Sequence, residues 1–415
     1  MWFNKRRELG KMNKNEFHPA TIKYIKKTPA AHRKSKGQYF TPQSIREKLL
    51  SQLPRRIKSP KIIDPACGTG EFLISAQKYF QSPQLYGWEI EKELVTITKE
   101  IVPKAKIKLA DTLQEKIKPE YDFVIGNPPY FEFKPKGLTR RKFAQVINGR
   151  INIFNLFIKI GLDLLKPNGY LAYVVPPSMN NGAYFAKLRD YIVQNANIEY
   201  LTIIKDSQLF HNAQQTVMLL VLKKTKNKCD YIFQKNGIRI FTPDSDLLKK
   251  AFKQKTTLKD LGYQVKTGRL VWNQNKKLLT NDSQKGIPLI WSRNITSKGL
   301  KIPGNFEKPQ YVKVDNYDCG PAIVVNRITG SVGKAKLKAA LVPERMKFIA
   351  ENHVNVIFPP KQLSLIQTSK KQKTLNLEEI LNQLRSPQKT KLIRYITGNT
   401  QISKTELENL FPINI

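Results

Sequence analysis

Cysteine and histidine are scarce in this chain of 415 residues. Its three cysteines, Cys67, Cys229 and Cys319, lie far apart and are odd in number, and it has four histidines. Separated cysteines in an odd number indicate a reducing compartment rather than a disulfide framework. Because the sequence has neither a Cys-x-x-Cys pair nor a group of neighbouring histidines, we expect no metal site.

Long apolar segments are absent from the sequence as well. No apolar run approaches the roughly 20 residues that a membrane-spanning helix needs. The opening segment MWFNKRRELGKMNKNEF lacks the apolar core of a signal peptide. We therefore expect a cytoplasmic protein with no membrane partner.

Acidic residues are few. The chain has 32 aspartates and glutamates against 72 lysines and arginines, a formal net charge of +40 and an isoelectric point near 10.0. Such a balance suits the neutralisation of phosphate groups. A lysine-rich chain can reflect only the base composition of its genome, but that bias would not by itself deplete acidic residues to this extent. The charge therefore favours a nucleic-acid partner.

A glycine-rich turn follows an apolar strand early in the sequence. The stretch KIIDPACGTGEFLISA, residues 61–76, is typical of a short strand, a turn and the opening of a helix. Gly68 and Gly70 let the backbone approach a ligand closely, and the free N–H groups of the following helix point toward it. The spacing is shorter than the dinucleotide-binding pattern, and no Gly-Lys-Ser/Thr follows, so the turn is not a phosphate loop in the strict sense.

Acidic or amide side chains follow the apolar strands along the chain. LYGWEI carries Glu89 about 20 residues beyond the turn, where an acidic group typically accepts hydrogen bonds from ribose hydroxyls. AKIKLAD ends with Asp111, which suits an adenine amino group, and the strand of YDFVIGNPPY ends at Asn127. Helical stretches separate the early strands. The pattern predicts a parallel α/β sheet with its ligand at the carboxyl ends of the strands.

The tetrapeptide Asn127-Pro128-Pro129-Tyr130 indicates a substrate with a planar amine. The nitrogen of an adenine amino group or a primary amide is a poor nucleophile, because its lone pair is delocalised into a π system. The side-chain oxygen of Asn127 and the carbonyl oxygen of Pro128 can each accept one N–H and turn the lone pair outward. The prolines stiffen the turn. Tyr130 offers a flat face on which an extruded base can stack, with about 1–3 kcal/mol per base.

The order of the motifs GQYFTP, DPACGTGEF, GWEIE, LAD and GNPPY resembles the gamma class of DNA adenine-N6 methyltransferases, the modification enzymes of type II restriction–modification systems. In that class the motif with Phe-Thr-Pro precedes the glycine-rich turn, and the target-recognition region follows the catalytic domain. The resemblance covers the chain from about Lys36 onward. It includes the less widely shared motifs KTGRLVWNQNK, PLIWSRNI, IVVNRITG and AENHVNVI.

The resemblance implies an α/β fold: a Rossmann-like, S-adenosylmethionine-dependent methyltransferase domain with a mixed α+β C-terminal DNA target-recognition domain. It places these residues around the cofactor S-adenosyl-L-methionine: Tyr39, Thr41, Asp64, Ala66, Gly68, Gly70, Glu89, Ile90, Asp111 and Phe157. It places these residues on the target base: Asn127, Pro128, Tyr130 and Phe210. One departure from the family pattern is Thr112, at a position where related enzymes can carry an aromatic residue.

Composition and pattern divide the chain into three parts. Residues 1–35 are expected to form a basic N-terminal arm, residues 36–245 the catalytic domain and residues 246–415 the DNA target-recognition domain. Arginine and asparagine can read guanine and adenine edges, but each alone is more often a phosphate contact or a fold-stabilising hydrogen-bonding group. The candidate DNA-binding residues are Arg269, Trp272, Arg293, Asn294, Asn326, Arg327, Asn352 and His353.

Three hypotheses of function follow. The favoured one is a monomeric, sequence-specific methyltransferase that modifies N6 of an adenine rotated out of duplex DNA. Double-stranded DNA and a separately encoded cognate restriction endonuclease are its expected partners. An enzyme of the same fold that methylates an RNA adenine or a protein glutamine amide is an alternative, because NPPY suits those planar amines too. A catalytically silent DNA-binding specificity subunit is the third.

Overall fold

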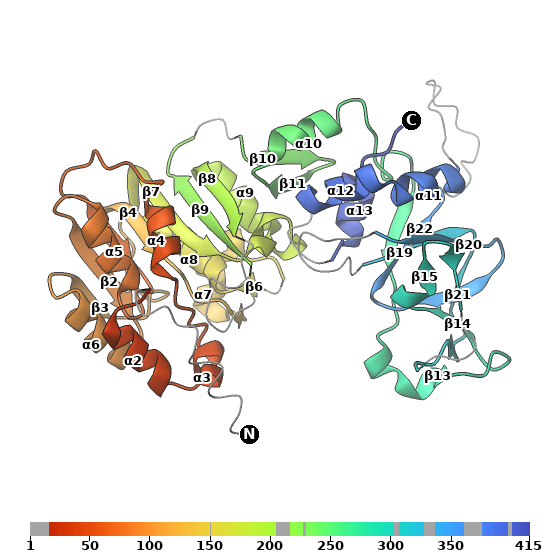
Figure 1. The fold of residues 1–415 in the computed structure, drawn as a ribbon, viewed down its shortest axis with the longest axis horizontal. Helices are drawn as coiled ribbons and strands as arrows, with labels where there is room; N and C mark the ends of the chain where they lie inside the picture. Colours follow the sequence, from red (N-terminus) through yellow and green to blue (C-terminus); the bar gives the residue numbers. More distant parts are fainter. Residues whose placement is uncertain are drawn as a thin grey trace. The chain divides into compact units, whose positions relative to one another are not determined.

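The computed structural model divides the chain into two compact units, unit 1 (residues 1–232) and unit 2 (residues 233–415) (Figure 1). The residues it describes are 16–149, 151–204, 216–226, 230–302, 307–327, 337–360, 376–396 and 401–415. The division falls before the expected boundary at residue 245. The segment in between forms a hairpin of β10 (Ile232–Lys235) and β11 (Ile238–Phe241), which packs with helix α10 (Ser245–Ala251) in the core of unit 2.

Unit 1 is built on a seven-stranded sheet. Its strands are β1 (Lys61–Asp64), β2 (Gln84–Glu89), β3 (Lys106–Leu109), β4 (Tyr121–Gly126), β7 (Leu165–Val175), β8 (Asn197–Ile204) and β9 (Val217–Lys223). They lie in the order β3-β2-β1-β4-β7-β9-β8. The pairings from β3 to β7 are parallel, and β9 runs antiparallel to both of its neighbours. The predicted α/β architecture with parallel strands is thus confirmed, with β9 as the exception.

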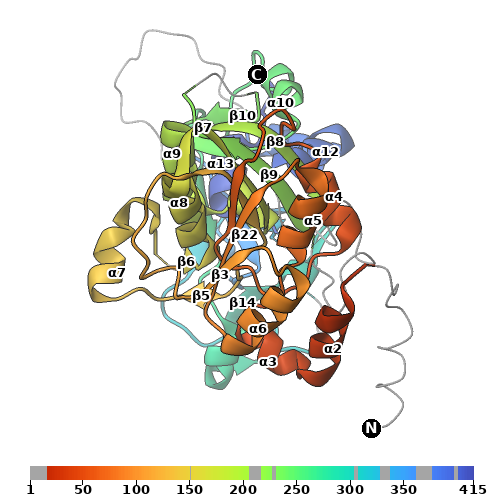
Figure 2. The ribbon, with the colours of Figure 1, turned by 90° about the vertical axis from the view of Figure 1, so that its left-hand side faces the viewer.

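Helices cover both faces of this sheet. The helices of unit 1 are α2 (Pro19–Lys27), α3 (Ala30–Ser35), α4 (Gln43–Leu50), α5 (Glu71–Tyr79), α6 (Lys92–Ile101), α7 (Gly137–Lys142), α8 (Phe154–Leu164) and α9 (Ala186–Asn195). Figure 2 shows α4 and α5 on one side of the sheet and α8 and α9 on the other. Alternation along β4 explains the arrangement. Phe123 and Ile125 join the core under α4 and α5, whereas Val124 faces Gly161 of α8.

The first described residues are folded onto unit 1 rather than forming a separate arm. Phe17, Thr21 and Tyr24 are buried, and the Thr21 hydroxyl donates to Thr69 Oγ1 in the glycine-rich turn at 2.9 Å. Burial of one face therefore anchors α2 on unit 1 even though the segment is basic. Residues 1–15, the start of the expected basic arm, lie outside the described part of the chain.

Unit 2 is a mixed α+β unit with two larger sheets. Its remaining strands are β12 (Gln264–Thr267), β13 (Leu279–Thr280), β14 (Ile287–Ile290), β15 (Ile295–Thr296), β16 (Gly299–Leu300), β17 (Tyr311–Val312), β18 (Asp318–Cys319), β19 (Ala322–Asn326), β20 (Ala339–Val342), β21 (Lys347–Ala350) and β22 (Val354–Phe358). One sheet has the order β12-β22-β19-β20 and the other β13-β17-β14-β21-β18. The unit ends with α11 (Leu377–Arg385), α12 (Pro387–Ile396) and α13 (Lys404–Leu410). Helix α13 begins with a capping box, in which the side chains of Ser403 and Glu406 each accept the backbone N–H of the other.

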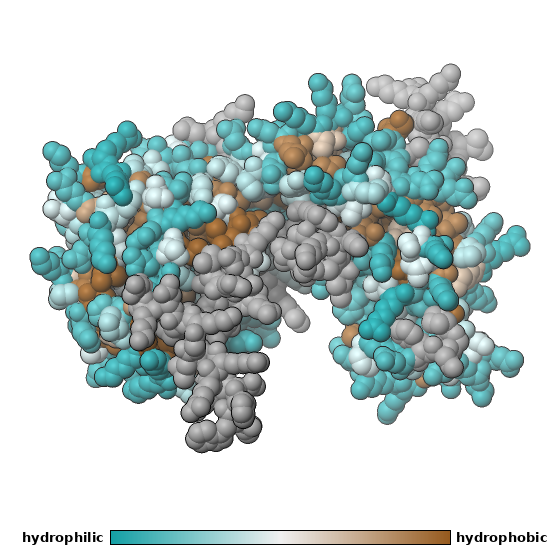
Figure 3. All heavy atoms as spheres, in the orientation of Figure 1, coloured by the Kyte–Doolittle hydropathy of each residue, from teal (hydrophilic) through white to brown (hydrophobic). Residues whose placement is uncertain are grey.

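Hydrophilic side chains cover most of the described face that Figure 3 shows. In the described residues, no helix combines the length and apolar character that crossing a bilayer requires.

Candidate active site

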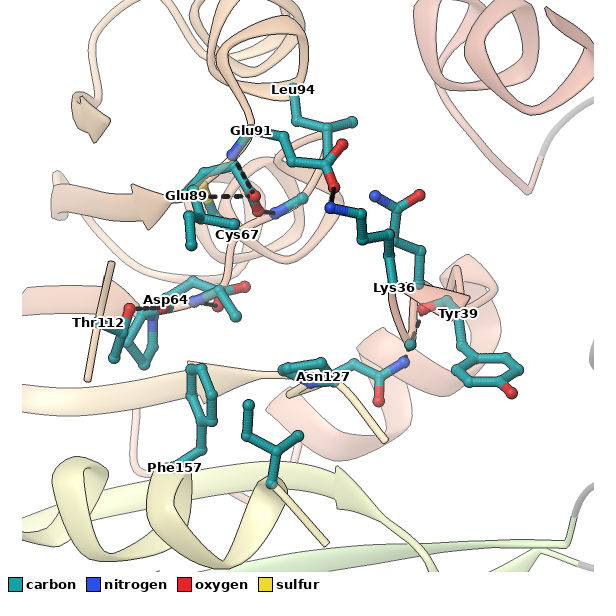
Figure 4. A pocket seen from close by; sticks show the side chains of 18 of the residues that line it. Lys36, Tyr39, Asp64, Cys67, Glu89, Glu91, Leu94, Thr112, Asn127 and Phe157 are labelled. Carbon is teal, nitrogen blue, oxygen red and sulfur yellow. Dashed lines mark hydrogen bonds and ion pairs between the residues drawn. The ribbon is translucent and has the colours of Figure 1, made fainter. Parts of the chain in front are cut away.

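A cavity of about 370 Å³ opens where β1, β2, β3 and β4 end, at the carboxyl edge of the sheet. Its walls come from the glycine-rich turn, the segments after β2 and β3, the NPPY segment, and the chain just before α4. The predicted cofactor-binding residues that line it are Tyr39, Thr41, Asp64, Ala66, Gly68, Glu89, Ile90, Asp111 and Phe157. Figure 4 shows how side chains from these separate strands enter one space.

Glycine is required in the turn by conformation and by packing. Gly68 and Gly70 have φ values of 55° and 86°, in the left-handed region. Gly70 is not part of the cavity wall. A Cβ atom there would lie 2.8 Å from Thr98 Cγ2 of α6, and the Thr98 hydroxyl donates to the Gly68 carbonyl at 2.7 Å. Gly70 therefore shapes the turn, and Gly68 forms the surface.

The carboxylate of Glu89 is fixed by backbone donors. It accepts N–H groups from Gly68 at 2.9 Å, from Ile90 at 2.8 Å and from Glu91 at 2.9 Å. Burial raises the pKa of Glu89, and these backbone donors oppose that rise. Since a carboxylate offers about four lone-pair sites, Glu89 can still accept a hydrogen bond from a ligand in the cavity.

Asp64 is the most deeply buried carboxyl group in the cavity wall, at 2% exposure. Its Oδ1 accepts the Ala66 N–H at 3.0 Å. Burial raises the pKa of Asp64 to about 8, the Ala66 N–H lowers it, and the negative charge of Glu89 raises it further. A cationic group in the cavity would favour the ionised form of this carboxyl.

Thr112 has a structural role that explains its place after Asp111. The buried Thr112 hydroxyl donates to the carbonyl of Pro65, so it ties the end of β3 to the glycine-rich turn. Asp111 Oδ1 accepts the Leu113 N–H at 3.0 Å. The departure from the family pattern therefore supplies an anchor for Asp111 rather than an aromatic contact.

Asn127 follows β4 and is held in one orientation. Its Nδ2 donates to the Tyr39 carbonyl at 2.8 Å and to Thr41 Oγ1 at 3.0 Å. Both acceptors belong to the segment before α4, which the sequence placed near the cofactor. Because two acceptors hold the amide nitrogen, the amide oxygen faces the opposite direction. The NPPY segment and the Phe-Thr-Pro motif therefore form one structure, which Figure 4 shows at Asn127 and Tyr39.

Tyr130 contacts Asn127 instead of presenting two open faces. Its hydroxyl lies within hydrogen-bond reach of both Asn127 Oδ1 and the Val174 carbonyl, the latter at 2.5 Å. Its ring stacks on Tyr39, with centroids 5.7 Å apart and an interplanar angle of 25°. Burial raises the pKa of Tyr130 well above its usual range. One face of the expected stacking surface is therefore occupied by Tyr39.

Several functional groups of the site carry no local sequence signal. Arg46 of α4 and Glu71 of α5 form a buried ion pair at 2.8 Å, in which Glu71 lines the cavity. At the cavity wall, Lys36 Nζ lies 3.7 Å from Glu91 Oε1 (Figure 4). These partners are distant in the sequence. The only sequence signal that could have identified these four residues is their position along the chain near the glycine-rich turn or the Phe-Thr-Pro motif.

Most of the candidate DNA-binding residues of unit 2 keep exposed surface, but two do not. Asn294 is 2% exposed, and its amide bonds to the Trp291 N–H, the Lys301 carbonyl and Gln310. Asn326 is 4% exposed, and its Oδ1 accepts the Lys338 N–H at 2.5 Å. The structure therefore favours the fold-stabilising interpretation for both asparagines over base reading.

The other candidates lie on segments that are hydrogen-bonded to one another, since the Asn352 N–H donates to the Leu270 carbonyl at 2.9 Å. Arg269 and Arg293 are exposed. Arg327 Nη1 donates to the Asn352 carbonyl at 2.7 Å, and His353 Nδ1 lies 2.8 Å from the buried carboxylate of Glu351. Arg327, Asn352 and His353 are therefore neighbours, since the Arg327 N–H also donates to the His353 carbonyl.

Trp272 lies beside Trp291 and under the ammonium group of Lys308. Phe210, the predicted second aromatic on the target base, lies outside the described residues.

The comparisons with known proteins agree with this geometry. The model of the N-6 DNA methylase family matches residues 23–276, and the chain belongs to this family. A type II methyltransferase M.CvrRI of Paramecium bursaria Chlorella virus XZ-6E is 26% identical over 71% of this chain and 78% of its own length. The modification methylase CviBIII of Chlorella virus NC1A is 26% identical over 86% of this chain and 92% of its length. The type II methyltransferase M.BsuBI of Bacillus subtilis is 24% identical over 91% and 87%.

The protein is thus a DNA methyltransferase, and its methyl donor is S-adenosyl-L-methionine. The donor set of the cavity fits this molecule. The carboxyl groups of Asp64, Glu89 and Asp111 line one space and suit its ammonium, hydroxyl and amino groups. Ile90 and Phe157 add apolar surface to the same wall.

Proposed function

We propose that this protein methylates N6 of an adenine that is rotated out of duplex DNA. The proposal rests on one observation: Asn127, whose amide nitrogen is held by Tyr39 and Thr41, stands in the wall of the same cavity as Glu89 and Asp111. An acceptor oriented in advance does not itself have to turn when the target amine arrives. Stacking and base pairing bury adenine N6 in a duplex, so the base must leave the helix, at a cost of a few kcal/mol.

The residues of the cavity wall have separate roles in this proposal. Glu89 accepts the ribose hydroxyls of the cofactor, Asp111 accepts its adenine amino group, and Ile90 and Phe157 flank the adenine ring. Asp64 and the backbone from Ala66 to Gly68 lie under its methionine part, beside Tyr39 and Thr41. When bound, S-adenosylmethionine supplies an electrophilic methyl carbon attached to a neutral leaving group, a thioether.

The NPPY segment acts on the other reactant. Asn127 Oδ1 and the Pro128 carbonyl accept the two N–H bonds of adenine N6, which localises the lone pair on the nitrogen. No strong base is needed, because the nitrogen becomes acidic once it is methylated and can lose its proton to water. Most of the catalysis therefore comes from positioning the two reactants. Tyr130 and Phe210 stack on the extruded base.

Unit 2 is the target-recognition domain in this proposal. It follows the catalytic unit, and its exposed Arg269 and Arg293 suit phosphate or base contacts. The relatives named type II methyltransferases support a place in a restriction–modification system. A separately encoded endonuclease as partner and a monomeric methyltransferase stay predictions from the sequence.

Labelled S-adenosylmethionine, incubated separately with duplex DNA, RNA and protein, tests the proposal. Label should enter only duplex DNA, with a rate that falls steeply with salt. Incorporation into RNA or into a glutamine side chain would establish the corresponding alternative. An absence of cofactor binding by calorimetry would establish a silent specificity subunit. Mapping methylated adenines in a host genome with and without the gene would then give the recognition sequence.

A further inference from the structure

A buried arginine connects the helix after the glycine-rich turn with the segment that orients Asn127. Arg46 of α4 is 2% exposed. Its Nη2 lies 2.8 Å from Glu71 Oε2, and its Nε donates to Ser75 Oγ at 2.9 Å. Its Nη1 donates to the main-chain carbonyl of Thr41 at 2.6 Å. One guanidinium group therefore joins α5 to the chain just before α4.

The same segment holds the amide of Asn127. Thr41 Oγ1 and the Tyr39 carbonyl both accept from Asn127 Nδ2. A flipped amide would place its oxygen against the Tyr39 carbonyl oxygen, and two acceptors repel each other. The direction of the Asn127 oxygen thus depends on where the backbone from Tyr39 to Thr41 lies, and Arg46 fixes that backbone at Thr41.

Stability alone does not account for this ion pair. Taking two charges out of water is costly, and a buried pair is often no better than apolar residues of similar volume. Burial lowers the pKa of Arg46, and the charge of Glu71 opposes that effect. Arginine also matches the geometry, because its planar fork reaches three acceptors on two elements at once, which a lysine ammonium on a flexible stem does not.

We propose that Arg46 is a positioning residue that sets the orientation of the Asn127 amide through Thr41, and so couples the cofactor turn to the target-amine acceptor. This inference rests on the proposed function of Asn127. It assigns to the buried pair of Arg46 and Glu71 a role in methyl transfer rather than in cofactor affinity.

A double-mutant cycle of Arg46→Lys and Thr41→Val tests the coupling through the single-turnover rate of methyl transfer to DNA. Each substitution should lower the rate on the order of tenfold to a hundredfold, as small misplacements of reacting groups do. The double variant should be no slower than the slower single variant, because both changes break one link. Rate losses that multiply would overturn the inference.

Arg189→Lys is the matched control. Arg189 is 3% exposed on α9, and its guanidinium donates to the carbonyls of Met179 and Gly182. Arg189→Lys should lower the unfolding free energy about as much as Arg46→Lys does. Any effect of Arg189→Lys on the methyl-transfer rate should multiply with the effect of Thr41→Val. Calorimetric affinity for S-adenosylmethionine should change less than about threefold in Arg46→Lys, because the lysine keeps a positive charge beside Glu71, the cavity-wall carboxyl that Arg46 contacts.

A second readout needs no substrate. In protein labelled with ¹⁵N-asparagine, the side-chain amide signal of Asn127, identified by its loss in Asn127→Asp, should exchange its protons faster in Arg46→Lys but not in Arg189→Lys. Unchanged exchange in Arg46→Lys would refute the inference. If the wild type transfers no methyl group to DNA, the proposed function is wrong, but the exchange rate still tests whether Arg46 orients the Asn127 amide. If Arg46→Lys does not fold, Glu71→Gln removes only the anchoring charge and should speed the same exchange.

Discussion

The Tyr130 hydroxyl lies within hydrogen-bond reach of the side-chain oxygen of Asn127, the atom that we propose accepts an N–H of the target amine. The acceptor is therefore occupied before the base arrives. The hydroxyl also lies 2.5 Å from the Val174 carbonyl, and a single proton cannot serve both oxygens at once. A target amine brings two N–H donors, so it can displace the hydroxyl from Asn127 and leave Tyr130 bonded to Val174.

Tyr130→Phe should strengthen binding of the extruded base. The phenyl ring keeps the stacking surface, whereas the competing hydroxyl is lost, and a hydrogen bond of this kind contributes about 0.5–1.5 kcal/mol. Fluorescence of 2-aminopurine at the target position measures base extrusion. We expect up to about tenfold tighter binding in Tyr130→Phe and weaker binding in Tyr130→Ala. If Phe and Ala weaken binding equally, the hydroxyl holds the base instead of competing with it.

Gly37→Ala should displace the NPPY segment. Gly37 has φ of 66°, and a Cβ atom there would lie 2.8 Å from the Tyr130 nitrogen and 2.9 Å from Phe131 Cδ1. Gly137→Ala is the control, because Gly137 also has a positive φ, 52°, but open space around its Cβ position. The control should lose about 1 kcal/mol of unfolding free energy from backbone strain. Gly37→Ala should lose about 1–3 kcal/mol more from overpacking, together with most methyl transfer. Equal losses in the two variants would contradict the close packing of Gly37 on the NPPY segment.

The carboxyl group of Asp64 should make stability fall as pH rises. Its pKa is raised from 3.8 to about 8 in the folded protein. Between these values the folded state holds a proton that the unfolded state has released, so unfolding free energy decreases with pH until about pH 8 and levels off above it. Asp64→Asn should flatten this slope, by on the order of 1 kcal/mol per pH unit between pH 6 and 8. Denaturant unfolding at several pH values measures it, and parallel curves for the two proteins would refute the shift.

Replacement by alanine should mainly weaken DNA binding at Arg293 and mainly lower the stability of the fold at Asn294. Arg293 is exposed, whereas Asn294 is buried with three hydrogen-bonding partners. Asn294→Ala should lower unfolding free energy by about 1–3 kcal/mol, because it leaves buried polar groups unsatisfied. Arg293→Ala should lose less stability than Asn294→Ala but bind DNA more weakly, with a shallower dependence on salt. A stability loss in Arg293→Ala as large as that in Asn294→Ala would place that side chain in the fold rather than at DNA.

Short motifs at strand ends explain what the sequence could predict. Gly68, Glu89, Asp111 and Asn127 each close or follow an apolar strand, and the parallel order of those strands brings them to one cavity. Local spacing was therefore sufficient for the parallel strands β1 to β4 and the residues that follow them, whereas the resemblance to the methyltransferase family was needed to place Tyr39, Thr41 and Phe157 at the cavity.

Long-range partners explain what the sequence could not predict. The partner of Arg46 lies on another helix, and one partner of the Asn294 amide is Gln310, sixteen positions away. A buried asparagine and an exposed one look alike in a polar stretch, because the difference is set by tertiary packing. The basic helix α2 was misleading for the same reason, since its buried face is covered only by tertiary contacts within unit 1.

The most direct test is to locate the transferred methyl group. Duplex DNA methylated by the wild-type protein is digested to nucleosides and separated by mass spectrometry, beside DNA treated with Asn127→Ala. We predict N6-methyladenine as the product of the wild type and no product from Asn127→Ala, which should still bind DNA and S-adenosylmethionine. A methyl group on cytosine, or undiminished turnover in Asn127→Ala, would contradict the proposed role of Asn127 and the assignment of adenine N6 as the target.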